Sequence, residues 1–150
     1  MGWILFMVLA WSTALMLVPI RYWRKSWPVG IFGIAAIYAI DNTLAELGAF
    51  RFWHGGIYIS YLPLYYWLGY FPGGIVFDCF RPKRHINRLI YVLVFAAGYL
   101  FVELVMIYFG YFQHLRWNAF KSLLLNVAGF TVSMWFAEWM EEGRNGGLST

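Results

Sequence analysis

The amino-acid sequence predicts an all-α protein, an integral membrane bundle of five transmembrane helices in which the third helix is kinked or interrupted. The first observation behind this prediction is composition. Of the 150 residues, 62% are hydrophobic and only 12% are charged, which is about half the charged fraction of an average soluble domain. The second observation is that long apolar runs alternate with short segments that carry most of the basic side chains, as in multi-pass membrane proteins. The length suits a single domain.

The apolar run from Leu89 to Tyr111 is the clearest of the predicted spans. It contains 23 residues and a single charged one, Glu103, near its middle. At about 1.5 Å per residue, such a helix is long enough to cross a hydrocarbon core of roughly 30 Å. Because an isolated carboxylate is unfavourable in hydrocarbon, Glu103 should face protein, water or a partner helix.

The other spans follow from the remaining apolar runs and the residues that flank them. No cleavable signal peptide is evident, so the first run is expected to stay as a span. Pro28 suits the start of the second span, because the missing N–H is not needed there. Pro72-Gly73-Gly74 should bend or unwind the third, and residues 140–150 should form a flexible tail. The five spans are expected at about residues 2–20, 28–50, 57–80, 89–111 and 119–139.

The basic side chains predict how these spans are oriented. Five spans place eight of the 11 lysines and arginines on one side of the membrane and three on the other. By the positive-inside rule, the first side faces the cytoplasm. We therefore expect a bacterial cytoplasmic (inner) membrane protein with its N-terminus outside and its C-terminus inside. The eight are Arg21, Arg24, Lys25, Arg81, Lys83, Arg84, Arg88 and Arg144, and the three are Arg51, Arg116 and Lys121.

Polar residues of three spans fall at similar depth below the outer ends of these spans. Helical spacing places Glu103 and Asn126 on the inward stripes of the fourth and fifth spans. Asp41 lies nine residues from the outer end of the second span, and Glu103 and Asn126 each lie eight residues in. The candidate ligand-binding or proton-binding residues are Asp41, Asn42, Glu46, Glu103, Asn126 and Lys121.

Two interpretations of this polar group remain open. In the first, the side chains hold the bundle together, with Glu46 paired to Lys121 and Glu103 to Asn126, for roughly 1 kcal/mol or less each. In the second, Asp41, Glu46 and Glu103 form an outward-facing pocket that binds a small cation or carries protons. Three acids beside one lysine exceed what neutralisation needs, which favours the pocket.

The tyrosine-rich third segment offers another kind of site. Beside the Pro-Gly-Gly sequence, its aromatic side chains would either fill the core or line a pocket for a hydrophobic ligand. The single Cys79 excludes an internal disulfide and a four-cysteine metal site, and the three histidines lie at span ends, so neither a metal nor a cofactor is expected. The candidate pocket-lining residues are Tyr61, Tyr65, Tyr66, Pro72, Gly73 and Tyr99.

Two family resemblances bear on the fold. The first resemblance is carried by Phe80-Arg81-Pro82-Lys83, Glu103, Tyr108, Tyr111, His114 and Trp117. Through these residues the second half of the chain, over roughly Tyr65 to Glu138, resembles small, functionally uncharacterised multi-spanning membrane proteins of endospore-forming bacteria. This resemblance implies topology rather than activity.

A second, fainter resemblance is carried by Asp41, Gly48, Phe50 and Leu62-Pro63-Leu64. In these residues the chain is similar to the lycopene-cyclase type of membrane domain from the carotenoid pathway. That family has two acids after its Leu-Pro-Leu motif, where this chain has Tyr65 and Tyr66.

These observations predict a small multi-pass membrane protein with an acidic pocket in its outer half. It would bind or transport a small cation or another ligand, or serve as an accessory subunit of a membrane complex. The alternative is an isoprenoid-processing or carotenoid-processing membrane enzyme that uses Asp41, Glu46 or Glu103 as acids. The expected partners are the lipid bilayer, a small cation or hydrophobic ligand, and a second copy or another membrane protein, but no nucleic acid.

Overall fold

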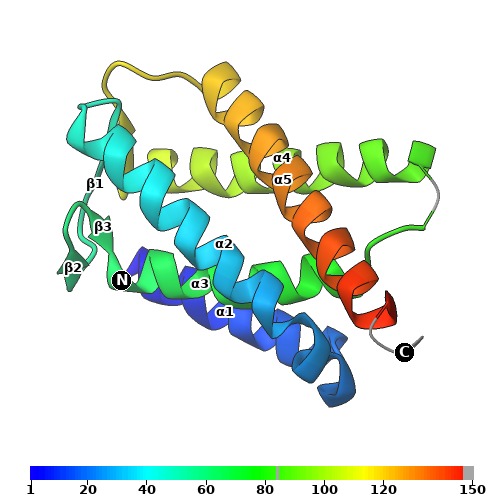
Figure 1. Cartoon of the computed structure of the whole chain (residues 1–150). Coiled ribbons are helices and arrows are strands. Elements are labelled where there is room, and N and C mark those ends of the chain that lie inside the picture. Colours follow the sequence, from blue (N-terminus) through cyan, green and yellow to red (C-terminus); the bar gives the residue numbers. More distant parts are fainter. Residues whose placement is uncertain (84, 147–150) are drawn as a thin grey trace.

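The computed structural model describes residues 1–83 and 85–146. In this part of the chain most residues belong to five α-helices, and the four strands are only two or three residues long (Figure 1). The helical class predicted from the sequence is therefore confirmed. The helices are α1 (Gly2–Leu17), α2 (Ile20–Glu46), α3 (Leu64–Cys79), α4 (His85–Tyr108) and α5 (Ala119–Gly146), and the strands are β1 (Phe50–Phe52), β2 (Tyr58–Ile59), β3 (Leu62–Pro63) and β4 (Phe112–His114).

Three of the described helices are long and apolar enough to cross a membrane. They are α2, α4 from Ile86 and α5 as far as Arg144, with mean hydropathies of 1.4, 2.3 and 1.3 in their most apolar windows. These helices support a membrane protein in contact with a lipid bilayer. α1 and α3 have 16 residues each and rise about 24 Å, less than a typical hydrocarbon core. Helix length and composition thus support three spans and not the predicted five.

Long-range contacts define two ends of the helix bundle. At the strand end, β1 pairs antiparallel with β4, with Arg51 opposite Gln113, and the Trp3 indole N–H donates to the Trp53 carbonyl over 3.2 Å. At the ion-pair end, Glu141 near the end of α5 lies 2.6 Å from Arg81 and 3.1 Å from Lys25. Each helix runs from one end to the other, and successive helices alternate in direction (Figure 1).

The second helix begins eight residues earlier than the start predicted at Pro28. It starts at Ile20, directly after Pro19, and Pro28 lies inside it. The basic and aromatic residues Arg21–Lys25 read as a loop because of their charge, yet arginine and lysine are good helix formers. The helix therefore continues through this polar segment beyond the apolar run.

The third predicted span contains a β-hairpin and a shorter helix. Tyr58 pairs with Pro63 and Ile59 with Leu62, and Ser60 at the turn has a φ of 57°. The helix α3 then begins at Leu64 and continues unbroken through Pro72. The predicted interruption at Pro72 is therefore wrong, and the structure does not support a kink.

The glycines of α3 serve close helix packing. A Cβ atom added at Gly74 would lie 2.9 Å from the Cα of Gly30 in α2, so the two backbones touch. A Cβ atom at Gly69 would lie 2.5 Å from the ring of Phe6 in α1. Small residues at such contacts are typical of helix packing in membranes.

The predicted ends of several spans also differ from the structure. Phe50 to Phe52 and Phe112 to His114, expected as a span end and a turn, pair as β1 and β4. The tail predicted to be flexible from residue 140 continues α5 to Gly146, because Glu141 is held by Arg81 and Lys25. Residues 147–150 of that tail, and Arg84 of the basic loop, lie outside the described residues.

Candidate functional site

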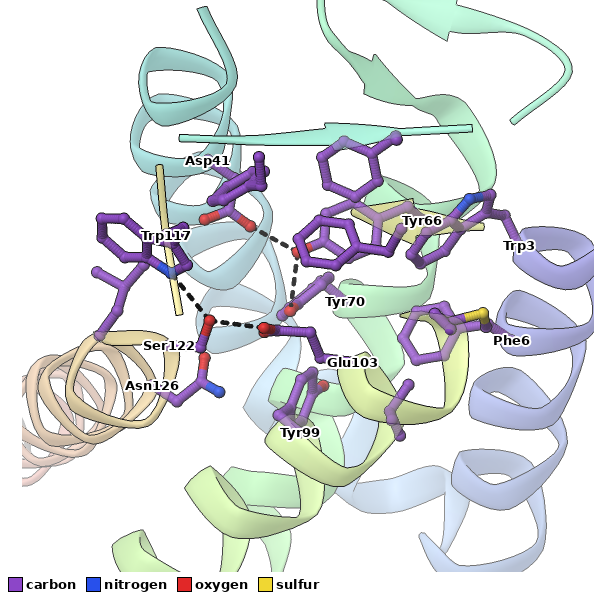
Figure 2. A pocket seen from close by; sticks show the side chains of 16 residues that line it. Trp3, Phe6, Asp41, Tyr66, Tyr70, Tyr99, Glu103, Trp117, Ser122 and Asn126 are labelled. Carbon is purple, nitrogen blue, oxygen red and sulfur yellow. Dashed lines mark hydrogen bonds between the residues drawn. The ribbon is translucent and has the colours of Figure 1, made fainter. Parts of the chain in front are cut away.

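A small cavity of about 40 Å³ lies inside the strand end of the bundle, and we call it the acidic cavity. All five helices and the strands β1 and β4 reach it (Figure 2). Its polar lining consists of Asp41 from α2, Tyr66 and Tyr70 from α3, Tyr99 and Glu103 from α4, and Ser122 and Asn126 from α5. Its aromatic walls are Trp3, Phe6, Phe50, Phe52, Phe112 and Trp117.

Asp41 is held on one side of the cavity by two tyrosines. Its side chain comes from the part of α2 nearest the strand end, and the residue is only 6% exposed. The Tyr66 hydroxyl donates to Asp41 Oδ2 over 2.5 Å, and the hydroxyls of Tyr66 and Tyr70 lie 3.1 Å apart (Figure 2). Since Tyr66 and Tyr70 are four residues apart in α3, they share one helix face, and the Tyr66 hydroxyl joins Asp41 to Tyr70.

Glu103 is held on the other side by residues that follow it in the chain. The Ser122 hydroxyl donates to Glu103 Oε1 over 2.6 Å, and His114 Nε2 lies 2.6 Å from the same oxygen. The Trp117 indole N–H in turn donates to Ser122 Oγ over 2.9 Å (Figure 2). An ionised carboxylate only accepts hydrogen bonds, so when Glu103 is ionised the His114 Nε2–H group donates to Glu103 Oε1.

Asp41 and Glu103 each have one carboxylate oxygen that is free to contact a ligand. Among the described residues, Asp41 Oδ1 and Glu103 Oε2 accept no hydrogen bond, and both side chains line the cavity. A second, mostly apolar cavity of about 70 Å³ shares Asp41, Tyr70, Tyr99 and Asn126 with the first and continues deeper along α2 and α5. Since one water needs about 10–15 Å³ of such space, each cavity has room for a small ion with a few waters.

The structure brings together part of the predicted polar group. Asp41, Glu103 and Asn126 line the acidic cavity, but Glu46 and Lys121 are exposed and do not. Neither predicted pairing is present: Lys121 Nζ lies 5.6 Å from the centre of the Trp117 ring, and the Asn126 amide donates to the Ala96 carbonyl over 3.5 Å.

The remaining candidates lie around the cavity rather than in one pocket. Tyr66 and Tyr99 line it, whereas Tyr61 is 49% exposed and its backbone N–H donates to Asn42 Oδ1 over 3.1 Å. Tyr65 packs against the aromatic cluster at the strand end. Pro72 is buried, and Gly73 lies directly behind the Tyr99 hydroxyl.

Four residues of the site were not predicted as binding candidates from the sequence: Tyr70, His114, Trp117 and Ser122. Helical spacing places His114 on the same face as Glu103, and Ser122 on the same face as Asn126. This spacing was the signal in the sequence that could have identified both residues. The contact of His114 with Glu103 depends on β4, because pairing with β1 positions the segment that carries His114. Such pairing of short strands, whose partners are 60 to 64 residues apart, has no local signature in the sequence.

Gly73 gives a direct test of how the cavity wall is built. A Cβ atom at this position would overlap the Tyr99 hydroxyl, so Gly73→Ala should lower stability by about 1–3 kcal/mol through overpacking. Adding Tyr99→Phe removes the overlapping oxygen and should restore most of the loss in a thermal unfolding assay. Gly98→Ala on the same helix as Tyr99, where nothing lies within 4 Å, is the matched control and should be neutral or stabilising. Failure of Tyr99→Phe to rescue would contradict this packing.

The chemistry of the acidic cavity suits a small cation. Two carboxylates from different helices face one enclosed space, and aromatic faces surround them, an arrangement that attracts positive charge. No group of three or more His, Cys, Asp or Glu side chains able to hold a metal ion occurs among the described residues.

Both family resemblances stay predictions. Comparison of the chain with protein-family models, curated proteins and solved structures finds no match.

Proposed function

We propose that the chain crosses a bacterial cytoplasmic membrane five times, with the strand end outside and the ion-pair end inside. All five helices run between the same two ends, which supports five crossings even though α1 and α3 are short. The β2–β3 hairpin directly precedes α3 and adds length on the strand side. The charge distribution of eight basic residues against three supports the orientation.

Reporter fusions test this topology. A reporter joined after Thr150 should be active only in the cytoplasm, and one inserted at Gly55 should be active only outside. A further fusion between α1 and α2, at Pro19, should behave like the first, because α1 would have crossed the membrane once. If the Pro19 fusion reads external, α1 does not span and the five-span proposal fails. The proposal also fails if the Thr150 and Gly55 fusions report the same side of the membrane.

We further propose that the acidic cavity binds a small cation, as a transporter or a binding subunit does. The observation that carries this proposal is the pair of carboxylates, Asp41 and Glu103, each with an oxygen free for a ligand in one small cavity. Buried carboxylates are unfavourable without a compensating charge. Of the two carboxylates, Glu103 alone has a basic partner among the described residues, His114, so Asp41 in particular gains from a bound cation or proton.

The size of the cavities weighs against the isoprenoid alternative. Sites for small organic molecules usually have volumes of about 300–1,000 Å³, whereas the two cavities beside the carboxylates measure about 40 and 70 Å³. A prenyl chain would require the helices to separate, and a hydrated monovalent cation would not. A pigment or prenyl lipid that co-purifies with the chain would favour the enzyme instead.

Cation titration of the purified protein in neutral lipid nanodiscs tests the proposal. Trp3 and Trp117 line the cavity, so their fluorescence should change with added Li⁺, Na⁺, K⁺ or NH₄⁺. N-methylglucamine, which is too large for the cavity, keeps the ionic strength constant and should have no effect. Saturable responses to at least one small cation are expected. If the fluorescence titration curves are identical and non-saturating for all cations, including N-methylglucamine, the cavity does not bind a small cation.

A further inference from the structure

The ion-pair end contains a second, much larger pocket that the proposed function does not use. It has a volume of about 520 Å³ and lies where α2, the end of α3, the start of α4 and α5 meet. Among the residues that the structure describes, four basic side chains line it, against two acidic ones. The basic residues are Lys25, Arg81, Lys83 and Arg88, and the acidic residues are Asp78 and Glu141.

The basic groups of this pocket are held in place by ion pairs. Arg81 has a side chain only 10% exposed and lies 3.3 Å from Asp78 and 2.6 Å from Glu141. Arg88 lies 2.7 Å from Glu138, which reaches it from outside the pocket lining. Donors fixed in this way lose little freedom when a ligand arrives, which favours binding.

An independent observation concerns Ser26. This residue is 1% exposed and lines the pocket, yet its hydroxyl has no hydrogen-bond partner among the described residues. An unpaired buried hydroxyl is unfavourable, and such groups usually have a partner. Lys83, which is exposed, forms no ion pair within the described part of the chain. The pocket therefore contains a buried hydroxyl and an ammonium group that a ligand can satisfy.

The charges of the pocket identify the class of ligand. The four basic and two acidic lining groups leave two positive charges, and counting Glu138 leaves one. Arginine, lysine and hydroxyl donors around one space match the several acceptor oxygens of a phosphate group. Under the proposed orientation this pocket faces the cytoplasmic leaflet, where anionic phospholipids occur and where basic pockets between helices bind their headgroups.

We propose that the pocket formed by Ser26, Lys83 and the paired Arg81 and Arg88 binds a phosphate group, either of an anionic lipid headgroup or of a free phosphate. The Ser26 hydroxyl and the Lys83 ammonium group donate to its oxygens, and the two guanidinium groups complete the site. This site is separate from the acidic cavity, so either proposal can fail without the other.

Thermal unfolding of the delipidated protein in a non-ionic detergent tests the proposal. Phosphatidylglycerol is added in one arm, and an uncharged galactosyl diacylglycerol with the same acyl chains is its control. Inorganic phosphate is added in the other arm, against chloride at equal ionic strength. A ligand that binds only the folded state raises the Tm. A rise with phosphatidylglycerol alone identifies a lipid headgroup, and a rise with inorganic phosphate identifies a free phosphate. The proposal is overturned if neither probe raises the Tm beyond its control.

Two variants connect the binding to this pocket. Ser26→Ala should raise the Tm of the ligand-free protein, because it removes an unpaired buried hydroxyl, and should weaken probe binding about fivefold. Lys83→Gln should leave the ligand-free Tm unchanged and weaken binding about tenfold. Ser12→Ala and Lys121→Gln, both at exposed positions, are the matched controls. Full retention of the probe-dependent Tm rise in both test variants would place binding elsewhere and refute the site.

Discussion

Glu103→Gln is expected to weaken cation binding to the acidic cavity by at least about tenfold, because interactions with a charged group contribute about 1.5–3 kcal/mol. The protein should stay folded, since glutamine has nearly the same shape and its oxygen still accepts from Ser122 Oγ, as Glu103 does over 2.6 Å. A buried amide is also less unfavourable than a buried charge. The measurement is the tryptophan fluorescence titration, repeated with the variant in the same nanodiscs.

The structure offers a matched control on α2. Glu46→Gln removes an acid that is exposed and does not line the acidic cavity, so its titration should match that of the unmodified protein. Asp41→Asn should behave like Glu103→Gln, because both carboxylates face the cavity. If Glu103→Gln and Asp41→Asn keep full affinity, and Glu103→Leu is neutral or stabilising, the acids serve packing alone.

Gly74→Leu is expected to prevent assembly of the native bundle. The nearest atoms to a Cβ at this position are Gly30 Cα at 2.9 Å, Val29 O at 3.0 Å and Gly30 N at 3.2 Å, all of them backbone. No side chain can rotate away, so α2 and α3 must separate. Even Gly74→Ala should lower the free energy of unfolding by about 3 kcal/mol, the upper part of the usual overpacking range.

The yield of monodisperse protein in detergent and its Tm measure this effect. Gly129→Ala in α5, where nothing lies within 4 Å of an added Cβ, is the control and should be neutral or stabilising. The distance to backbone atoms predicts that Gly74→Ala is much more harmful than Gly129→Ala. Equal Tm values for these two variants would show that α2 and α3 do not touch at Gly74.

The sequence alone was sufficient for the helical membrane class and for the position of the most apolar helix. The run Leu89–Tyr111 overlaps α4 over most of its length, because continuous apolar composition is a local property that one helix expresses by itself. The start of α5 at Ala119 was also predicted. Helical spacing further placed Glu103 and Asn126 on inward faces, and both line one cavity. Asp41, which the spacing placed beside the inward stripe of its span, lines the same cavity.

Boundaries and turns were predicted less well, because different structures share the same local signals. Pro28 is compatible with a helix start and also with the interior of α2, where the structure has it. Pro72-Gly73-Gly74 reads as a helix breaker in isolation. In the bundle, the absence of a side chain lets the backbone of Gly74 contact Gly30 and lets Gly73 contact the Tyr99 hydroxyl. The same residues therefore permit close packing. Only the neighbouring helices distinguish these two uses.

The tertiary structure alone decided the partners of the charged side chains. His114 reaches Glu103 because β4 pairs with β1, and Glu141 reaches Arg81 because α3 and α5 end side by side. Glu46, expected in the pocket, is exposed and does not line it. Helical periodicity fixes the relative angles of residues within one helix. The rotation of one helix against another depends on the packing of all the side chains between them, which no single segment contains.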